Sequence, residues 1–130
     1  MARIYESGED YLEMIHILHL SNNFVRAVDI AHNLDVSKPS VSRAMGILRD
    51  GGFIQVGDDG NITLTETGRE VAERIYERHQ VLTQWLIDIG VTPETAAEDA
   101  CKLEHDISIE SFNCLKDHLR KSHPHVQLDT

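Results

Sequence analysis

One stretch of the chain departs from the helical pattern that the rest follows. In residues 53–65, FIQVGDDGNITLT, apolar side chains alternate with polar ones around the turn Asp58-Asp59-Gly60, which predicts a β-hairpin. On both sides, apolar residues recur every three or four positions, the spacing of amphipathic helices. The chain is therefore expected to be mainly α, with one two-stranded hairpin between two sets of helices.

Three helical patterns precede the hairpin and three follow it. The predicted helices cover residues 9–20, 25–36, 37–53, 66–90, 92–106 and 108–119. Ser37, Thr92 and Ser108 are the expected N-caps of three of them, with either Thr65 or Thr67 capping the long fourth helix. Gly90 is expected to end that helix. The buried stripes should include Val28 in the second helix and Ile89 in the fourth.

Three short helices followed by a hairpin are the order of a winged helix–turn–helix, whose third helix enters the DNA major groove. The residues expected to contact DNA are Arg26, Ser37, Lys38, Pro39, Ser40, Ser42 and Arg43. From residue 26 to residue 49, four basic residues face two acidic ones, although the net charge of the chain is −10. An acidic protein surface repels phosphate, so we expect contact to concentrate on the third helix.

Two observations temper the DNA-binding interpretation. The same order of elements also occurs in protein-binding modules. The turn of the hairpin carries Asp58 and Asp59, whose charges repel phosphate, so the wing should contribute little beyond contacts from Asn61 or main-chain amides.

The second half of the chain carries a thiol, a carboxylate and an imidazole at helical spacing. Cys101, Glu104 and His105 occupy positions i, i+3 and i+4 of the fifth predicted helix, which places them on one face. The full set of candidate metal ligands is Asp10, Glu13, His79, Cys101, Glu104 and His105. Oxygen and imidazole ligands suit Mn(II) or Fe(II), whereas a thiolate favours softer ions.

Each candidate ligand also has an ordinary structural explanation. A histidine on an apolar stripe is usually a core residue, acids in a first turn favour the helix dipole, and a buried cysteine packs like a small hydrophobe. Zinc motifs of the CxxC or HExxH type do not occur. The remaining histidines are expected at the surface or in packing: His16, His19, His32 and His118, with His123 and His125 in a frayed tail at residues 123–130.

The order of four segments resembles the diphtheria toxin repressor and manganese transport regulator family. These segments are EDYLE, AVDIAHNLDVSKPSVSRAMGILRDGGFI, LTETGREVAERIYERHQVL and DACKLEHDIS, and the resemblance extends over residues 7–120. Its most specific features are the Tyr-x-Arg-His and Cys-x-x-Glu-His segments. The resemblance implies a winged helix–turn–helix at residues 1–65 and an α-helical dimerisation and metal-binding unit at 66–122. It also implies a homodimer on palindromic double-stranded operator DNA, with one or two Mn(II) or Fe(II) ions per protomer.

The ligand positions combine two branches of that family. Asp10 and Glu13 match the first-helix acids of the manganese branch, whereas the iron branch has methionine in place of Asp10 and no acid at position 13. Cys101 matches the iron branch, because the manganese branch has glutamate there. Thr83 stands where a carboxylate is expected.

The predicted function is a cytoplasmic, metal-dependent transcriptional regulator, a repressor of metal-homeostasis genes and not an enzyme. No apolar run approaches the roughly 18 residues needed to span a bilayer, and neither a membrane nor a small-molecule substrate is an expected partner. Two alternatives remain. One is a metal-independent winged-helix regulator that senses a small ligand or oxidation of Cys101. The other is a metal-dependent phosphoester hydrolase.

Overall fold

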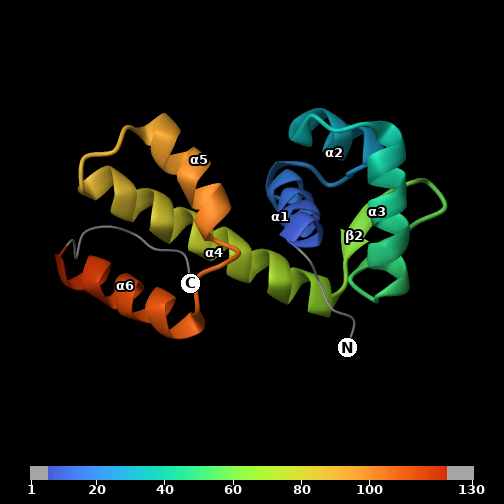
Figure 1. Cartoon of the computed structure of the whole chain (residues 1–130). Coiled ribbons are helices and arrows are strands. Elements are labelled where there is room, and N and C mark those ends of the chain that lie inside the picture. Colours follow the sequence, from blue (N-terminus) through green and yellow to red (C-terminus); the bar gives the residue numbers. More distant parts are fainter. Residues whose placement is uncertain (1–5, 123–130) are drawn as a thin grey trace. The chain divides into compact units, whose positions relative to one another are not determined.

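The computed structural model describes residues 6–122, which form six helices and one antiparallel hairpin (Figure 1). The elements are α1 (Glu6–Ser21), α2 (Ala27–Leu34), α3 (Lys38–Asp50), β1 (Ile54–Val56), β2 (Ile62–Leu64), α4 (Glu66–Asp88), α5 (Pro93–Leu103) and α6 (Ile109–Ser122). The predicted mainly α class and the position of the hairpin are confirmed. Among the described residues, no helix is long and apolar enough to cross a membrane.

The chain divides into two compact units, which we call the N-terminal unit (Met1–Glu73) and the C-terminal unit (Arg74–Thr130). The N-terminal unit contains α1, α2, α3, the hairpin and the start of α4. The C-terminal unit contains the rest of α4 together with α5 and α6.

Capping residues set most helix ends, as the sequence predicts. The hydroxyl oxygens of Ser37, Thr65 and Ser108 each accept a hydrogen bond from the backbone N–H three residues on, at 3.2, 3.2 and 3.0 Å. Thr65 is therefore the cap of α4. Gly90 follows α4 with a φ of +108°, a conformation that glycine adopts at little cost. Thr92 is the N-cap of α5, but its side chain makes no capping hydrogen bond.

Some predicted boundaries were wrong. The fifth helix ends at Leu103 and not at residue 106, because the Asp106 N–H bonds the Leu103 carbonyl and closes a tighter turn. The sixth continues to Ser122, and α1 begins at Glu6. The predicted burial of Val28 and Ile89 was also wrong.

The exposure of these two residues has local causes. Val28 is 46% exposed, because it lies about 200° around α2 from the buried Ile30. Ile89 is 62% exposed, because it follows the last residue of α4 and leaves the helical stripe.

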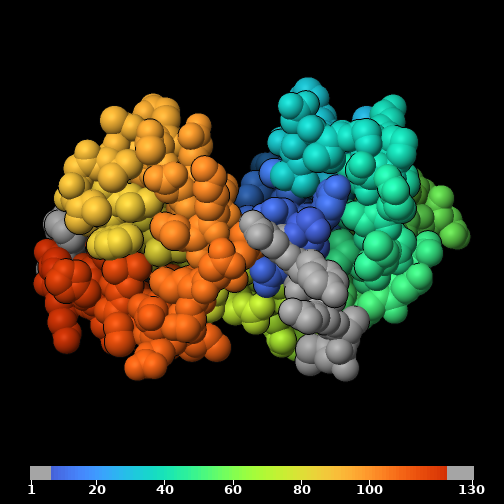
Figure 2. Space-filling view, viewed as in Figure 1, coloured from blue at the N-terminus to red at the C-terminus, as the bar shows by residue number. Residues whose placement is uncertain are grey.

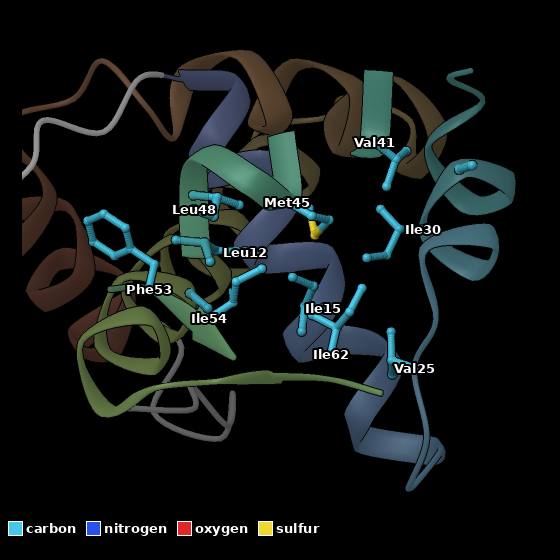
Figure 3. Packing of buried hydrophobic residues seen from close by; sticks show 12 residues of the cluster. Leu12, Ile15, Val25, Ile30, Val41, Met45, Leu48, Phe53, Ile54 and Ile62 are labelled. Atoms are coloured by element: carbon cyan, nitrogen blue, oxygen red, sulfur yellow. The ribbon is translucent and has the colours of Figure 1, made fainter. Parts of the chain in front are cut away.

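The core of the N-terminal unit lies between its helices and the hairpin (Figure 3). In this view, side chains from α1, α3 and the hairpin point toward one another. The residues labelled there are Leu12, Ile15, Val25, Ile30, Val41, Met45, Leu48, Phe53, Ile54 and Ile62. This packing takes up the inner face of α3 and leaves its opposite face to solvent.

Backbone contacts join the hairpin to the helices around it. The strands pair with Ile54 opposite Leu64 and Val56 opposite Ile62, and the Ile62 N–H donates to the Val25 carbonyl at 2.8 Å. A Cβ atom at Gly68 would lie 2.0 Å from the Phe53 carbonyl oxygen, so only glycine lets the first turn of α4 approach this closely.

The C-terminal unit has a much smaller apolar cluster. Its buried members are Val81, Phe112 and Leu119, with Trp85 and Ile107 packed against them. An ion pair between Lys116 and Glu77 also joins α6 to α4. In Figure 2, the atoms of α5 and α6, orange to red, form one continuous surface with those of the second half of α4, in yellow.

Candidate metal site and nucleic-acid interface

Three predicted metal ligands converge in the C-terminal unit. His79 comes from α4, Cys101 from the last turn of α5, and Glu104 is the C-cap of α5. The Nδ1 atom of His79 lies 3.0 Å from Oε2 of Glu104 and 3.7 Å from Sγ of Cys101. All three ligand atoms lie within 4.8 Å of one another. Donors at metal–ligand distances of about 2.0–2.3 Å from one ion have similar separations.

The Glu104 carboxylate is the most unusual group in this cluster. Its side chain is fully buried, and only its Oε2 oxygen has a hydrogen-bond partner within the part of the chain that the structure describes. Burying a carboxylate away from water is costly unless its oxygens are paired or coordinate a metal. The other oxygen, Oε1, is a carboxylate oxygen that could ligate a cation. The donor set therefore fits a divalent cation.

His105 lies beside the same carboxylate. Its Nε2 atom is 3.6 Å from Oε1 of Glu104, too long for a hydrogen bond, and its side chain is only 2% exposed. Because α5 ends at Leu103, Glu104 and His105 stand in the turn after the helix and not on its face. Glu104 keeps helical backbone angles, which preserves its spacing from Cys101.

The remaining ligand candidates are placed as follows. Asp10 and Glu13 lie on α1, in the N-terminal unit. Cys101 is exposed, so the ordinary explanation of a buried cysteine packed like a small hydrophobe does not apply to it. Cys114, on α6, is also an exposed free thiol.

The other histidines have separate surroundings. The ring nitrogens of His19 face the Ile62 and Asn22 carbonyl oxygens at 2.7 and 3.2 Å, which is a packing role. Burial lowers the pKa of His16 below its usual value, with the neighbouring Glu73 carboxylate acting in the opposite direction. His32 and His118 are exposed. The predictions for His123 and His125 fall outside the described residues.

The predicted DNA-contacting residues of α3 lie at its start and on its outer face. Lys38, Pro39, Ser42 and Arg43 are exposed, on the side away from the buried Val41. An exposed first turn and outer face are what a recognition helix needs to enter a groove.

Two of the predicted serines are partly occupied within the protein. The Ser37 hydroxyl donates to the Ser40 hydroxyl at 2.8 Å and also caps the helix. The sequence analysis missed Ile47, which is 70% exposed one turn after Arg43. The i, i+4 spacing from Arg43 is the signal that could have placed it on the outer face.

Arg26 and the hairpin flank this helix. Arg26 is the N-cap of α2, is exposed, and has its guanidinium 4.8 Å from the centre of the Phe24 ring. Asp58 and Asp59 are exposed at the tip of the hairpin. Oδ1 of Asp59 accepts a hydrogen bond from the Asn61 N–H at 3.0 Å, so that amide is already engaged.

Comparison with known proteins assigns both halves of the chain. Residues 3–61 match the model for the N-terminal DNA-binding domain of iron-dependent repressors, and residues 65–127 match the model for their metal-binding and dimerisation domain. The transcriptional regulator MntR of Salmonella typhimurium is 37% identical over 105 residues, covering 81% of this chain and 67% of that protein. The chain belongs to the iron-dependent repressor family. Membership of this family makes it a metal-dependent, DNA-binding transcriptional regulator.

Further matches agree with membership of the iron-dependent repressor family. An uncharacterised helix–turn–helix regulator of Methanocaldococcus jannaschii is 34% identical over 118 residues, covering 89% of this chain and 94% of that protein. The solved structure of the manganese regulator SloR superposes with a TM-score of 0.79 at 26% identity, covering 87% of this chain. The chain spans about half the length of SloR, 53%.

Proposed function

We propose that this protein is a cytoplasmic repressor that senses Mn(II) or Fe(II) and controls metal-homeostasis genes. It would act as a homodimer on palindromic double-stranded operator DNA, with no enzymatic activity. Both family models support this, since one describes a DNA-binding domain and the other a metal-binding and dimerisation domain.

The observation that carries the proposal is the buried carboxylate of Glu104. A fully buried carboxylate with one oxygen lacking a hydrogen bond, next to an imidazole and a thiol, is explained by an ion that binds all three groups. We therefore assign His79, Cys101, Glu104 and His105 as ligands. Asp10 and Glu13 complete the set on the strength of the family resemblance.

The identity of the ion depends on the balance between hard and soft donors. Carboxylates and imidazoles suit Mn(II) and Fe(II), and a thiolate at position 101 shifts the preference toward Fe(II) and away from Mn(II). One or two ions per protomer are compatible with six ligand side chains. Mn(II) remains a candidate ion, because a solved structure that resembles this chain is named a manganese regulator.

The ligand set would also explain how metal controls DNA binding. Asp10 and Glu13 belong to the unit that carries α3, whereas the other ligands belong to the C-terminal unit. The family resemblance implies that metal binding is coupled to DNA affinity, and a helix–turn–helix dimer would place its two α3 helices about 34 Å apart on DNA. The expected coupling is about 1–3 kcal/mol.

The test is DNA binding in the presence of defined metals. Duplexes are selected from a random library by the protein with Mn(II), and separately by the protein with chelator. The affinity for the selected duplexes is then measured with chelator, Mn(II), Fe(II) and Zn(II) in turn, under anaerobic reducing conditions. Tighter binding with Mn(II) or Fe(II) supports the proposal.

Two other results would favour the alternatives. Operator binding that is equal with chelator and with every metal points to a metal-independent regulator, for which the exposed thiol of Cys101 is a candidate sensor. Metal-dependent turnover of a generic phosphodiester would indicate a hydrolase.

A further inference from the structure

Arg78 is a second buried charged residue near the candidate metal site, beside Glu104. It is not a candidate ligand. It lies on α4 immediately before His79 and is 7% exposed. Its Nη1 atom donates to the backbone carbonyl of Glu104 at 3.2 Å and to that of Ile107 at 2.8 Å. A buried guanidinium is costly unless hydrogen bonds such as these compensate it.

The two carbonyls belong to the turn that carries Glu104 and His105. The last carbonyls of a helix have no partners within it, and the helix dipole favours a positive charge at this end. Arg78 supplies both the donors and the charge at the end of α5. It thereby fastens the turn to α4, one residue from His79.

This arrangement sets the geometry of the candidate metal site. Arg78 and His79 are consecutive on α4, so they point in directions about 100° apart. One binds the backbone of the turn and the other faces the Glu104 side chain at 3.0 Å. A shift of the turn along α4 would break the Arg78 hydrogen bonds and would also move the Glu104 carboxylate away from the His79 ring.

We propose that Arg78 is a positioning residue, which preorganises the metal site by holding the turn from Glu104 to Ile107 against α4. This inference rests on the metal-binding role proposed above. A guanidinium cannot itself ligate a cation, so Arg78 acts only through the residues it places. Groups that orient metal ligands typically change metal affinity about 10–100-fold when they are removed.

The chain offers a matched control for a purely structural role. Lys116 is also a partly buried cation; it joins α6 to α4 through its ion pair with Glu77. Both cations approach the Phe112 ring, Arg78 at 5.5 Å and Lys116 at 6.0 Å from its centre. The ion pair of Lys116 with Glu77 and its contact with the Phe112 ring both lie outside residues 101–107.

The experiment measures the Mn(II) dissociation constant by calorimetry for the wild type, Arg78→Lys, Arg78→Met and Lys116→Met. The melting temperature of each metal-free protein is recorded beside it. The affinity of Arg78→Met should fall about 10–100-fold. That of Arg78→Lys should fall less, because lysine keeps the charge but lacks the planar guanidinium. Lys116→Met should bind Mn(II) like the wild type even if its melting temperature falls as far.

Co(II) absorption gives a readout that lost stability alone would not move. The d–d bands of bound Co(II) should shift in Arg78→Lys and stay at the wild-type position in Lys116→Met. If Arg78→Met does not fold, the inference is tested by comparing the Mn(II) affinity and Co(II) bands of Arg78→Lys with those of Lys116→Met. The inference about Arg78 would be overturned if Arg78→Lys kept the wild-type Mn(II) affinity and Co(II) bands. It would also be overturned if Arg78→Lys and Lys116→Met lost Mn(II) affinity equally. Neither result would overturn the proposed function. A wild type that takes up no Mn(II), Fe(II) or Zn(II) would overturn the proposed function with it.

Discussion

The two units of this protein differ in the side chains that they bury. The N-terminal unit buries a large cluster of aliphatic and aromatic side chains between three helices and a hairpin. The C-terminal unit also buries apolar side chains, among them Ile75, Leu82 and Leu119, but its fully buried Glu104 and its buried Arg78 lie within 26 residues of each other and are in contact. The N-terminal unit buries one charged side chain among its described residues, Glu13. Apolar burial stabilises the first unit without any charged partner, whereas a buried charge is costly unless it is compensated.

This difference suggests a division of labour. A unit with a self-sufficient apolar core can present a rigid α3 to DNA. If Glu104 binds a cation, as proposed above, the stability of the C-terminal unit depends on the metal concentration, as a sensor requires.

Truncating the apolar core should destabilise the N-terminal unit strongly. Ile30 is fully buried, so Ile30→Ala should lower the free energy of unfolding by about 2–5 kcal/mol through the lost burial and the cavity left behind. Val28→Ala, on the same helix but exposed, should change it by less than about 0.5 kcal/mol. Urea unfolding followed by circular dichroism measures both. Similar losses for the two variants would mean that the core is not packed as described.

Metal should stabilise the C-terminal unit through Glu104. At a free Mn(II) concentration about 100 times the dissociation constant, the free energy of unfolding should rise by about 2.7 kcal/mol. Glu104→Gln keeps the size of the side chain but removes its charge, so it should abolish this gain without lowering the stability of the metal-free protein by a similar amount. Thermal melts of both proteins with Mn(II) and with chelator test this. An undiminished Mn(II) effect in Glu104→Gln would remove Glu104 from the site.

Arg43 should contribute directly to DNA binding. Arg43→Ala should weaken binding by about 1–3 kcal/mol if the side chain contacts a base. If it contacts only phosphate, the loss should be similar on every duplex and the dependence on salt should flatten. Asp58→Asn, at the hairpin tip, is the control and should bind at least as tightly as the wild type. Fluorescence anisotropy at several salt concentrations separates the cases, and an Arg43→Ala protein with unchanged affinity would exclude the residue from the interface.

The smallest expected effect concerns the cap of α3. The Ser37 oxygen accepts from the Ser40 N–H, so Ser37→Ala should cost about 1 kcal/mol of stability. Ser37→Gly should cost only a few tenths, because glycine is tolerated at N-caps. Denaturant unfolding of the three proteins provides the measurement. A loss as large in the glycine variant as in the alanine variant would contradict the capping role.

Local signals were enough to predict much of the fold. The period change at the hairpin, the caps at Ser37 and Ser108, and Gly90 after α4 act over a few residues, so the sequence displays them directly. The end of α5 was missed because no glycine or proline marks it. The helix stops where Arg78, 26 residues earlier in the chain, binds the Glu104 carbonyl.

The candidate site was predictable in its residue types but not in its surroundings. Helical spacing suggested that Cys101 and Glu104 lie together, and their approach to His79 is seen in the structure. The full burial of Glu104 and the exposure of Cys101 depend on how α4, α5 and α6 pack, which residue spacing does not encode. In the sequence, Arg78 was noted only as part of the Tyr-x-Arg-His segment, and nothing there predicted its contact with the Glu104 carbonyl.

The most direct test of the central claim joins the metal site to DNA binding in one experiment. The affinity of the wild type and of Glu104→Gln for a selected duplex is measured with Mn(II) and with chelator. The account predicts that Mn(II) tightens binding by the wild type about 5–150-fold and leaves Glu104→Gln at its metal-free affinity. Equal tightening in both proteins, or none in the wild type, would contradict it.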